Sequence, residues 1–214
     1  MNKPPFSVSK ELDGWLLFWA YLEWNRSPGD WGKRLRQAET EVQGRLDLER
    51  LSSYPPVAEM RKLFRAAGTD PTRYRPASEA LLRRVLKGDA LPSIHPLVDL
   101  NNCLSLRIAC PCCVMAEGSF APPLIFRGGR PGEIYESLKG PFRLEDKPLL
   151  VDTLGPLDAP ITGNVRVKIE ENTTAAWLVS YLPGQAVELE QAGFALTDLA
   201  DPASGIRVSR ISGC

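Results

Sequence analysis

The chain has 214 residues, of which 43% are hydrophobic and 24% are charged, and its formal net charge is zero. This length allows one large domain or two small ones. Zero net charge excludes a surface that is basic all over and binds nucleic acid without sequence preference. The longest nearly unbroken apolar run, residues 15–22, is too short to span a bilayer, which takes roughly 20 helical residues, so no interaction with membranes is expected.

The N-terminal half is predicted to be mainly helical. Residues 15–24 are rich in aromatic and aliphatic side chains and end at a turn signal, which is typical of a buried strand. Asp30 is a suitable N-cap for the next segment, because apolar residues recur at helical spacing from Trp31 to Leu46. Proline and glycine signals delimit three further helices, near residues 57–67, 76–87 and 97–107.

From residue 120 onwards, short strands separated by glycine and proline are predicted. Five of them are residues 124–126, 133–135, 149–152, 165–170 and 175–182. The clearest is VRVKIE, residues 165–170, because its aliphatic side chains alternate with charged ones. A helix at residues 187–199 and a strand at 206–211 follow. The pattern predicts an α+β fold with a mainly antiparallel sheet flanked by helices, which are concentrated in the N-terminal half.

Three of the five cysteines, Cys110, Cys112 and Cys113, lie within ACPCCVMAEG. A structural zinc site needs four ligands, usually in two separated pairs, and the chain offers no second pair and a single histidine, His95. A redox Cys-x-x-Cys pair lacks its usual strand–helix context here. We interpret the segment as a tight loop with partly buried thiols, and expect no metal and no cofactor. His95 is expected to be a packed, hydrogen-bonded side chain.

The N-terminal segment lacks the apolar core of a signal peptide, so we expect a cytoplasmic protein with reduced thiols.

The charge is distributed unevenly along the chain. Residues 61–87 contain eight lysines and arginines but only two acids, Asp70 and Glu79, which is a local excess of six positive charges. Amphipathic helices with ordinary solvated faces account for such an excess. The functional alternative is a basic flank that contacts the phosphate backbone of RNA. Its contacts would be Arg73, Arg75, Arg83, Arg84 and Lys87.

Residues 73–106, RYRPASEALLRRVLKGDALPSIHPLVDLNNCLSL, resemble the B3/B4 domain, the tRNA-binding and editing module of the phenylalanyl-tRNA synthetase β subunit. The module's Val-Asp-x-x-Asn motif at the head of a helix is matched by Val98, Asp99 and Asn102. Weaker motifs follow in the same order: Arg127, Gly132-Glu133, Asp152, Gly163 and Thr173-Thr174 before a buried strand. The resemblance implies one B3/B4-like domain over residues 1–214, with an N-terminal strand and helices at 1–70 and a core at 71–200.

The resemblance further implies a protein that binds tRNA or aminoacyl-tRNA and hydrolyses mischarged aminoacyl-tRNA in trans. Its substrate-binding residues would be Asp99, Asn102, Gly163 and Thr174. Two polar groups of the synthetase's editing site have no counterpart, because the loop at residues 109–118 contains no histidine and Val179-Ser180 lacks the acid. The cysteines are expected to line or border the same cavity without being catalytic, and no catalytic residue is assigned.

The alternative function is a binding module for a free amino acid or small metabolite, without RNA activity. This alternative fits the zero net charge and the two missing polar groups, and added salt should leave the ligand affinity of such a module nearly unchanged. A complete synthetase is not expected, because no ATP-binding catalytic domain is recognisable.

Overall fold

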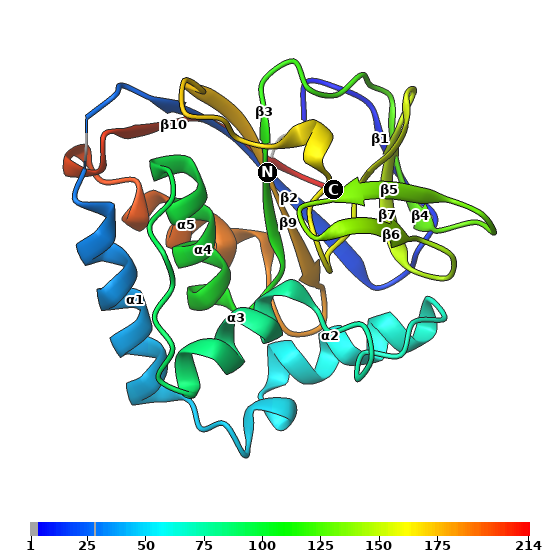
Figure 1. Cartoon of the computed structure of the whole chain (residues 1–214), viewed down its shortest axis with the longest axis horizontal. Helices are drawn as coiled ribbons and strands as arrows, with labels where there is room; N and C mark the ends of the chain where they lie inside the picture. The colour runs from blue at the N-terminus through cyan, green and yellow to red at the C-terminus, as the bar shows by residue number, and fades with distance from the viewer. Residues whose placement is uncertain (1–3, 28) are drawn as a thin grey trace.

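The computed structural model describes residues 4–27 and 29–214 (Figure 1). This part of the chain forms α1 (Trp31–Arg45), α2 (Pro55–Ala66), α3 (Ala77–Leu86), α4 (Pro96–Ile108) and α5 (Leu189–Leu199). Three short 3-10 helices are η1 (Leu51–Ser53), η2 (Val165–Val167) and η3 (Pro202–Ser204). Asp30 caps α1 as predicted, because its side chain accepts a hydrogen bond from the Lys33 backbone N–H at 3.3 Å. The predicted concentration of helices in the N-terminal half is confirmed, since α5 is the one α-helix of the described residues in the C-terminal half.

A four-stranded antiparallel sheet, the central sheet, runs through the middle of the molecule. Its strands, in spatial order, are β10 (Ile206–Gly213), β2 (Trp15–Trp24), β9 (Ala175–Pro183) and β3 (Cys112–Ala116). β2 has the bounds that its composition predicts, and it pairs with β10 on one side and β9 on the other. β2 and β10, which come from opposite ends of the chain, therefore lie side by side in the central sheet, with β10 at its edge.

A second four-stranded sheet contains β1 (Val8–Lys10), β4 (Leu124–Gly128), β7 (Pro148–Asp152) and β8 (Gly155–Asp158), in that order. β1 and β4 are parallel, and the other two pairs are antiparallel. A hairpin of β5 (Ile134–Ser137) and β6 (Gly140–Arg143) forms the remaining sheet. The predicted α+β class with mainly antiparallel pairing is confirmed.

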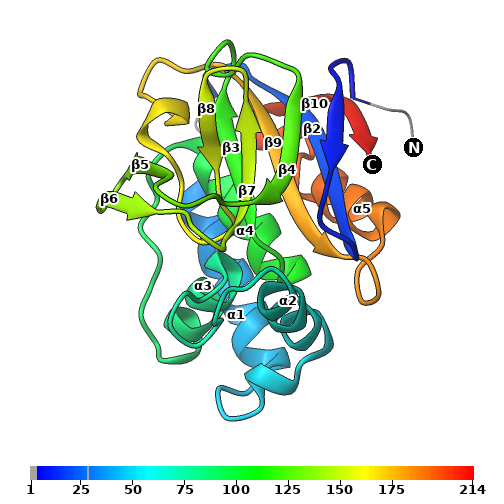
Figure 2. The same ribbon diagram turned by 90° about the vertical axis from the view of Figure 1, so that its right-hand side faces the viewer.

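The elements form three layers, with α1, α4 and α5 on one face of the central sheet and the second sheet on the other (Figures 1 and 2). Successive side chains of β2 point to opposite faces of the central sheet, and apolar side chains on both faces explain why both are covered. Phe18 and Leu22 pack into a cluster with the helices, whereas Trp15 and Trp19 pack with residues of the second sheet and α2. All four side chains are at most 2% exposed, so both faces of the central sheet are covered along most of β2, and its C-terminal end is partly exposed.

The segment VRVKIE is not a strand, so the prediction for residues 165–170 was wrong. Its first three residues form η2, and the Val165 side chain is 41% exposed. Two local contacts override the alternation. The Asn164 side chain accepts a hydrogen bond from the Arg166 backbone N–H at 3.0 Å, and the Arg166 guanidinium binds both carboxylate oxygens of Asp152. Asn side chains that bond the backbone two residues on favour turns over strands.

The cysteine segment is a strand for the most part, so the interpretation as a tight loop was also wrong. α4 ends at Ala109, which adopts a left-handed conformation, and β3 begins at Cys112. β3 pairs along its whole length with β9, and Cys112 lies opposite Ser180. β3 also contacts α4, the helix that precedes it.

Candidate functional site

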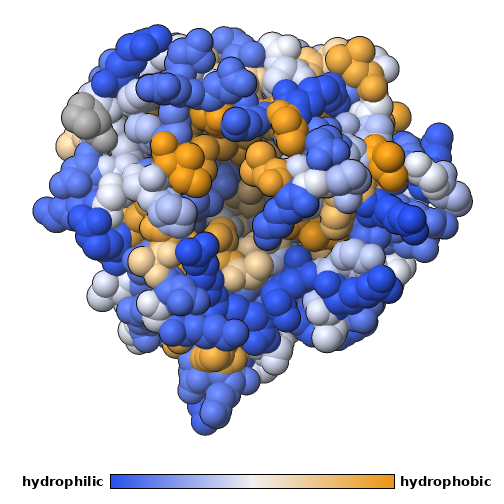
Figure 3. Space-filling view, in the orientation of Figure 1, coloured by the Kyte–Doolittle hydropathy of each residue, from blue (hydrophilic) through white to orange (hydrophobic). Residues whose placement is uncertain are grey.

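A cavity of about 390 Å³ opens at the β3 edge of the central sheet. α3 and α4 form one wall, and the segment from the end of β8 to η2 forms the opposite wall. On α4 the lining residues are Val98, Asn101, Asn102 and Ser105, which share one helical face because they are spaced by three, one and three positions. Figure 3 shows a hollow near the middle of this face of the molecule, with hydrophobic side chains inside it and at its edge.

Asp158, at the end of β8, supplies a fully buried carboxyl group to this cavity. The Tyr181 hydroxyl of β9 donates a hydrogen bond to its Oδ2 at 2.6 Å. Burial raises the pKa of Asp158 to about 7, and the bond from Tyr181 only partly opposes that effect. The carboxyl group therefore keeps its proton to a much higher pH than a solvated aspartate does.

Cys112 and Cys113 line the same cavity, as expected for the cysteine segment. The Cys112 thiol lies 3.1 Å from the Ser180 hydroxyl and burial raises its pKa to about 12. Burial also raises the pKa of the Cys113 thiol, and Asp158 adds to the shift. Both thiols are thus protonated at neutral pH, and a protonated thiol is a poor nucleophile and a poor metal ligand. Their contribution to the cavity is shape and weak polarity.

Of the four residues predicted to bind substrate, the structure brings Asn102 and Gly163 to the cavity from opposite walls. Asp99 is fully buried behind the α4 wall, where its carboxylate accepts hydrogen bonds from the Ser93 hydroxyl (2.5 Å) and the Ile94 N–H (3.0 Å). Thr174 precedes β9, and its carbonyl accepts a hydrogen bond from the Trp24 N–H at 2.7 Å. Neither Asp99 nor Thr174 lines the cavity.

The rim of the cavity is both hydrophobic and basic. Ile94 and Leu138 are 69% and 65% exposed, although both are large aliphatic side chains. Lys139 and Lys168 also line the opening and are exposed to solvent. The cavity therefore combines an acidic group at its buried end with positive charge at its mouth.

The five predicted RNA contacts occupy different environments. Arg75 and Arg83 are turned toward the buried Glu79 carboxylate, at 3.5 and 2.9 Å, and Arg61 of α2 binds the same group at 3.0 Å. Arg73 stacks over the Tyr74 ring, 5.2 Å from its centroid.

Arg84 and Lys87 are exposed. They follow Ala77, Ala80 and Leu81, the α3 residues that line the cavity, at helical spacing. Lys87 is the C-cap residue of α3. The α3 face that forms the cavity wall therefore leads to two solvated cations.

The single histidine has a structural contact, as expected. His95 is the N-cap of α4, and its Nδ1 accepts a hydrogen bond from the Leu97 N–H at 3.2 Å. Its ring packs edge-on against Trp24, and burial lowers its pKa. His95 is thus neutral at pH 7 and does not line the cavity.

The other motif residues that carried the resemblance hold the scaffold together. Arg127 is 5% exposed and forms a two-pronged ion pair with Glu133, at 2.6 and 2.9 Å. Asp152 accepts hydrogen bonds from the Ala121 and Leu154 N–H groups as well as from Arg166. These contacts fix the ends of β4 and β7, and Asp152 connects β7 to the segment that carries Gly163.

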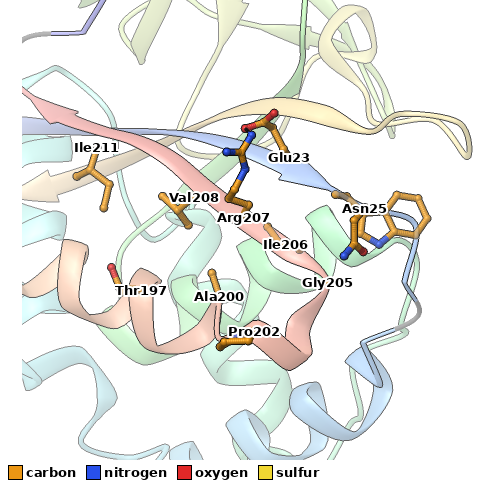
Figure 4. A pocket seen from close by; sticks show the side chains of 11 residues that line it. Glu23, Asn25, Thr197, Ala200, Pro202, Gly205, Ile206, Arg207, Val208 and Ile211 are labelled. Carbon is orange, nitrogen blue, oxygen red and sulfur yellow. Dashed lines mark hydrogen bonds and ion pairs between the residues drawn. The ribbon is translucent and has the colours of Figure 1, made fainter.

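A second, more open groove of about 650 Å³ lies between α5 and β10 (Figure 4). Its walls come from the C-terminal end of α5, from η3 and from β10. The charged side chains there, Arg207 and Glu23, pair with each other at 2.8 Å, and their side chains are 72% and 36% exposed. The groove contains no buried titratable side chain, so the cavity at β3 is the better candidate for chemistry.

Among residues 4–27 and 29–214, no three His, Cys, Asp or Glu side chains are grouped so that they could hold a metal ion. The described helices include none that is long and apolar enough to cross a membrane.

Sequence reasoning missed Asp158, Tyr181 and Asn101. The sequence signal for Asp158 was an acid between Leu157 and Ala159 in an otherwise apolar stretch. Nothing in that stretch indicates that Asp158 of β8 contacts Tyr181 of β9. Tyr181 looks like one more core residue of a buried strand.

The fold and the site together define a class, an α+β protein with a ligand-sized cavity at the edge of a mainly antiparallel sheet. The chain belongs to the B3/4 domain family, whose model matches residues 59–198 and so includes every residue that lines the cavity.

A similar solved structure is an N-terminal fragment of the phenylalanyl-tRNA synthetase β-subunit from Pyrococcus horikoshii. Its TM-score is 0.50 at 14% sequence identity, and the match covers 97% of this chain. The chain spans only about half of that fragment, 51% of its length. No curated protein matches the chain significantly.

Proposed function

We propose that the cavity binds the aminoacyl end of an aminoacyl-tRNA, and that the protein hydrolyses mischarged species in trans in the cytoplasm. The observation that carries the proposal is that one face of α3 lines the cavity and then presents two exposed cations, Arg84 and Lys87, to solvent. An amino acid in the cavity would place the tRNA backbone outside, where Lys139, Lys168, Arg84 and Lys87 offer positive charge. The synthetase named by the similar structure acts on tRNA, which agrees with this assignment.

Asn102 and Gly163 are the proposed substrate contacts. The Asn102 amide can donate to the ester carbonyl or hold a water molecule, and Gly163 leaves the backbone accessible. An aminoacyl ester is an activated bond, so a positioned water is a sufficient nucleophile. Asp99 has an indirect role in this proposal, because it fixes the chain segment that precedes α4.

The first experiment measures tRNA binding as a function of salt. Wild type is compared with Arg84→Ala/Lys87→Ala and with Lys33→Ala/Arg36→Ala, a control that removes two exposed cations from α1. The α3 variant should bind more weakly than wild type. Its log affinity should also fall less steeply with log salt, with a slope that is smaller in magnitude by roughly 1–2, because each phosphate contact contributes about 1. The control should leave both quantities unchanged. Equal effects of the two variants, or a flat salt dependence, would contradict the RNA assignment and favour the free amino acid alternative.

The second experiment is single-turnover deacylation of a panel of aminoacyl-tRNAs. Asn102→Ala should abolish the hydrolysis of one species, whereas Thr174→Ala, at a residue outside the cavity, should leave it within about twofold. Rates equal to spontaneous hydrolysis across the whole panel would exclude an esterase and leave a binding protein.

A further inference from the structure

The buried end of the cavity contains a carboxyl group with an unused acceptor. Oδ2 of Asp158 receives the Tyr181 hydroxyl, but Oδ1 has no hydrogen-bond partner among the described residues, although the side chain is fully buried. The Cys113 thiol and the Ala159 N–H lie near the carboxyl group and lower its pKa, yet neither meets hydrogen-bond geometry at Oδ1. A buried acceptor without a donor is costly.

The unused oxygen lies in the wall of the cavity, beside Gly163. Asp158 lines the cavity, and a Cβ atom built on Gly163 would lie 4.0 Å from Oδ1. A second buried acceptor, the side-chain oxygen of Asn101, also has no partner and belongs to a residue that lines the same cavity. Both atoms call for a ligand that donates hydrogen bonds.

The groups that face Asp158 supply no positive charge. They are Tyr181 of β9, Cys113 of β3 and Tyr135 of β5, all of which are neutral acids at pH 7 because burial raises their pKa values. Lys139 and Lys168 are solvated at the rim, and neither contributes to the shift in the Asp158 pKa. An ionised Asp158 therefore has no counter-charge within the described chain.

We propose that Asp158 binds a primary ammonium group of the ligand through Oδ1. This inference rests on the proposed function only for the identity of the ligand. An aminoacyl ester carries an ammonium group on its amino acid and phosphates on its RNA, which matches an acidic end and a basic mouth. The ammonium could be the α-ammonium of the aminoacyl group or the side-chain ammonium of a basic amino acid, and both would meet the same carboxylate.

Ammonium binding requires the ionised carboxylate, so Asp158 gives up its proton to solvent when the ligand binds. With a pKa of about 7, the ionised fraction rises roughly tenfold between pH 6 and pH 8. Affinity for a side-chain ammonium, whose ordinary pKa is about 10.4, should rise by about the same factor over this range. An α-ammonium, with an ordinary pKa of about 7.7–8.0, loses part of its own charge by pH 8, so its affinity should rise only about fourfold. A neutral ligand should show no such gain.

The test uses three small probes without any nucleotide: leucine amide, N-acetylleucine amide and Nα-acetyllysine amide. They present an α-ammonium, no ammonium and a side-chain ammonium. Binding to the full chain is measured by NMR titration up to about 20 mM, since small ligands often bind with millimolar Kd. The variant is Asp158→Asn, which keeps an acceptor for Tyr181, and the control is Glu23→Gln, which neutralises an acid in the groove of Figure 4.

We expect one of the two ammonium probes to bind at least tenfold more tightly than N-acetylleucine amide at pH 8, and which one does so identifies the source of the ammonium. Asp158→Asn should abolish this preference and its pH dependence, and Glu23→Gln should preserve both. Equal affinity for all three probes, a preference that survives in Asp158→Asn, or no binding of any probe would overturn the proposal. Because the probes lack RNA, these outcomes are independent of the tRNA-binding experiment.

Discussion

Asp158 should make the stability of the protein depend on pH. Its pKa rises from 3.8 to about 7 on folding because the group is buried. The folded state therefore binds more protons than the unfolded state between pH 4 and 7, and the free energy of unfolding falls as pH rises through this window. The expected loss is roughly 4 kcal/mol at most, at about 1.4 kcal/mol per unit of pKa difference.

Comparison with Asp158→Asn isolates this contribution. The variant should match wild type near pH 4 and be more stable than wild type at pH 8, as measured by urea denaturation at each pH. His95 acts in the opposite direction, because its pKa is lowered on folding, but it contributes equally to both proteins. A difference in stability that is independent of pH would contradict the assignment of the slope to Asp158.

Gly163 permits a clean separation of folding from binding. A Cβ atom there would contact only Asp158 Oδ1, at an ordinary distance of 4.0 Å. We expect Gly163→Ala to change the free energy of unfolding by less than about 1 kcal/mol. Gly163→Leu should fill the cavity and weaken the binding of the ammonium probes by at least tenfold, with little change in thermal midpoint. Undiminished probe binding by Gly163→Leu would place the ligand elsewhere.

At the scale of residues, the sequence identified the motif positions of the cavity but not its charged group. Asn102 and Gly163 were recognisable because a family pattern contains them. Asp158 has no such pattern, and its burial depends on the packing of β8 against β9, which only the tertiary structure provides.

At the scale of elements, Glu79 joins α2 to α3. Its carboxylate is 1% exposed and accepts from both Arg61 and Arg83 at about 3 Å. Glu79→Gln should lower the free energy of unfolding by about 2 kcal/mol, because it removes a buried negative charge that the partly buried guanidinium groups of Arg61 and Arg83 share. The matched control is Glu59→Gln on α2, whose partner Lys62 is 65% exposed and whose loss should cost less than about 1 kcal/mol. Similar losses of stability for the two variants would contradict the claim that the ion pairs of Glu79 stabilise the packing of α2 against α3.

The elements that the sequence predicted correctly are those with strong local signals. β2 is a long apolar run that ends at a turn, and α1 begins with a capping aspartate. The errors arose where a local pattern had two solutions. Residues 165–170 alternate like a strand, but Asn164 and Asp152 bind Arg166 and fix a turn instead. Cys112 and Cys113 follow a proline and resemble a loop, but the neighbouring β9 offers a pairing edge.

At the scale of the whole molecule, the central sheet joins two strands inside the family match, β3 and β9, to two strands outside it, β2 and β10. The match covers residues 59–198, whereas β2 and β10 lie before and after it. β2 sits between β10 and β9, and its inward side chains belong to both large hydrophobic clusters. We therefore propose that residues 1–70 and 71–200 fold as one unit.

Two measurements test this unity. Far-UV circular dichroism and tryptophan fluorescence should report one coincident transition in urea, because the five tryptophans are divided between the two clusters and β2 contributes side chains to both. A fragment of residues 59–198 should fail to fold, since β9 would lose the strand that covers it and expose Val179 and Tyr181, which are fully buried in the whole chain. Its amide NMR spectrum should then lack dispersion. A dispersed spectrum for the fragment, or two separate transitions in the full chain, would show that the matched region is an autonomous domain to which β2 and β10 are added.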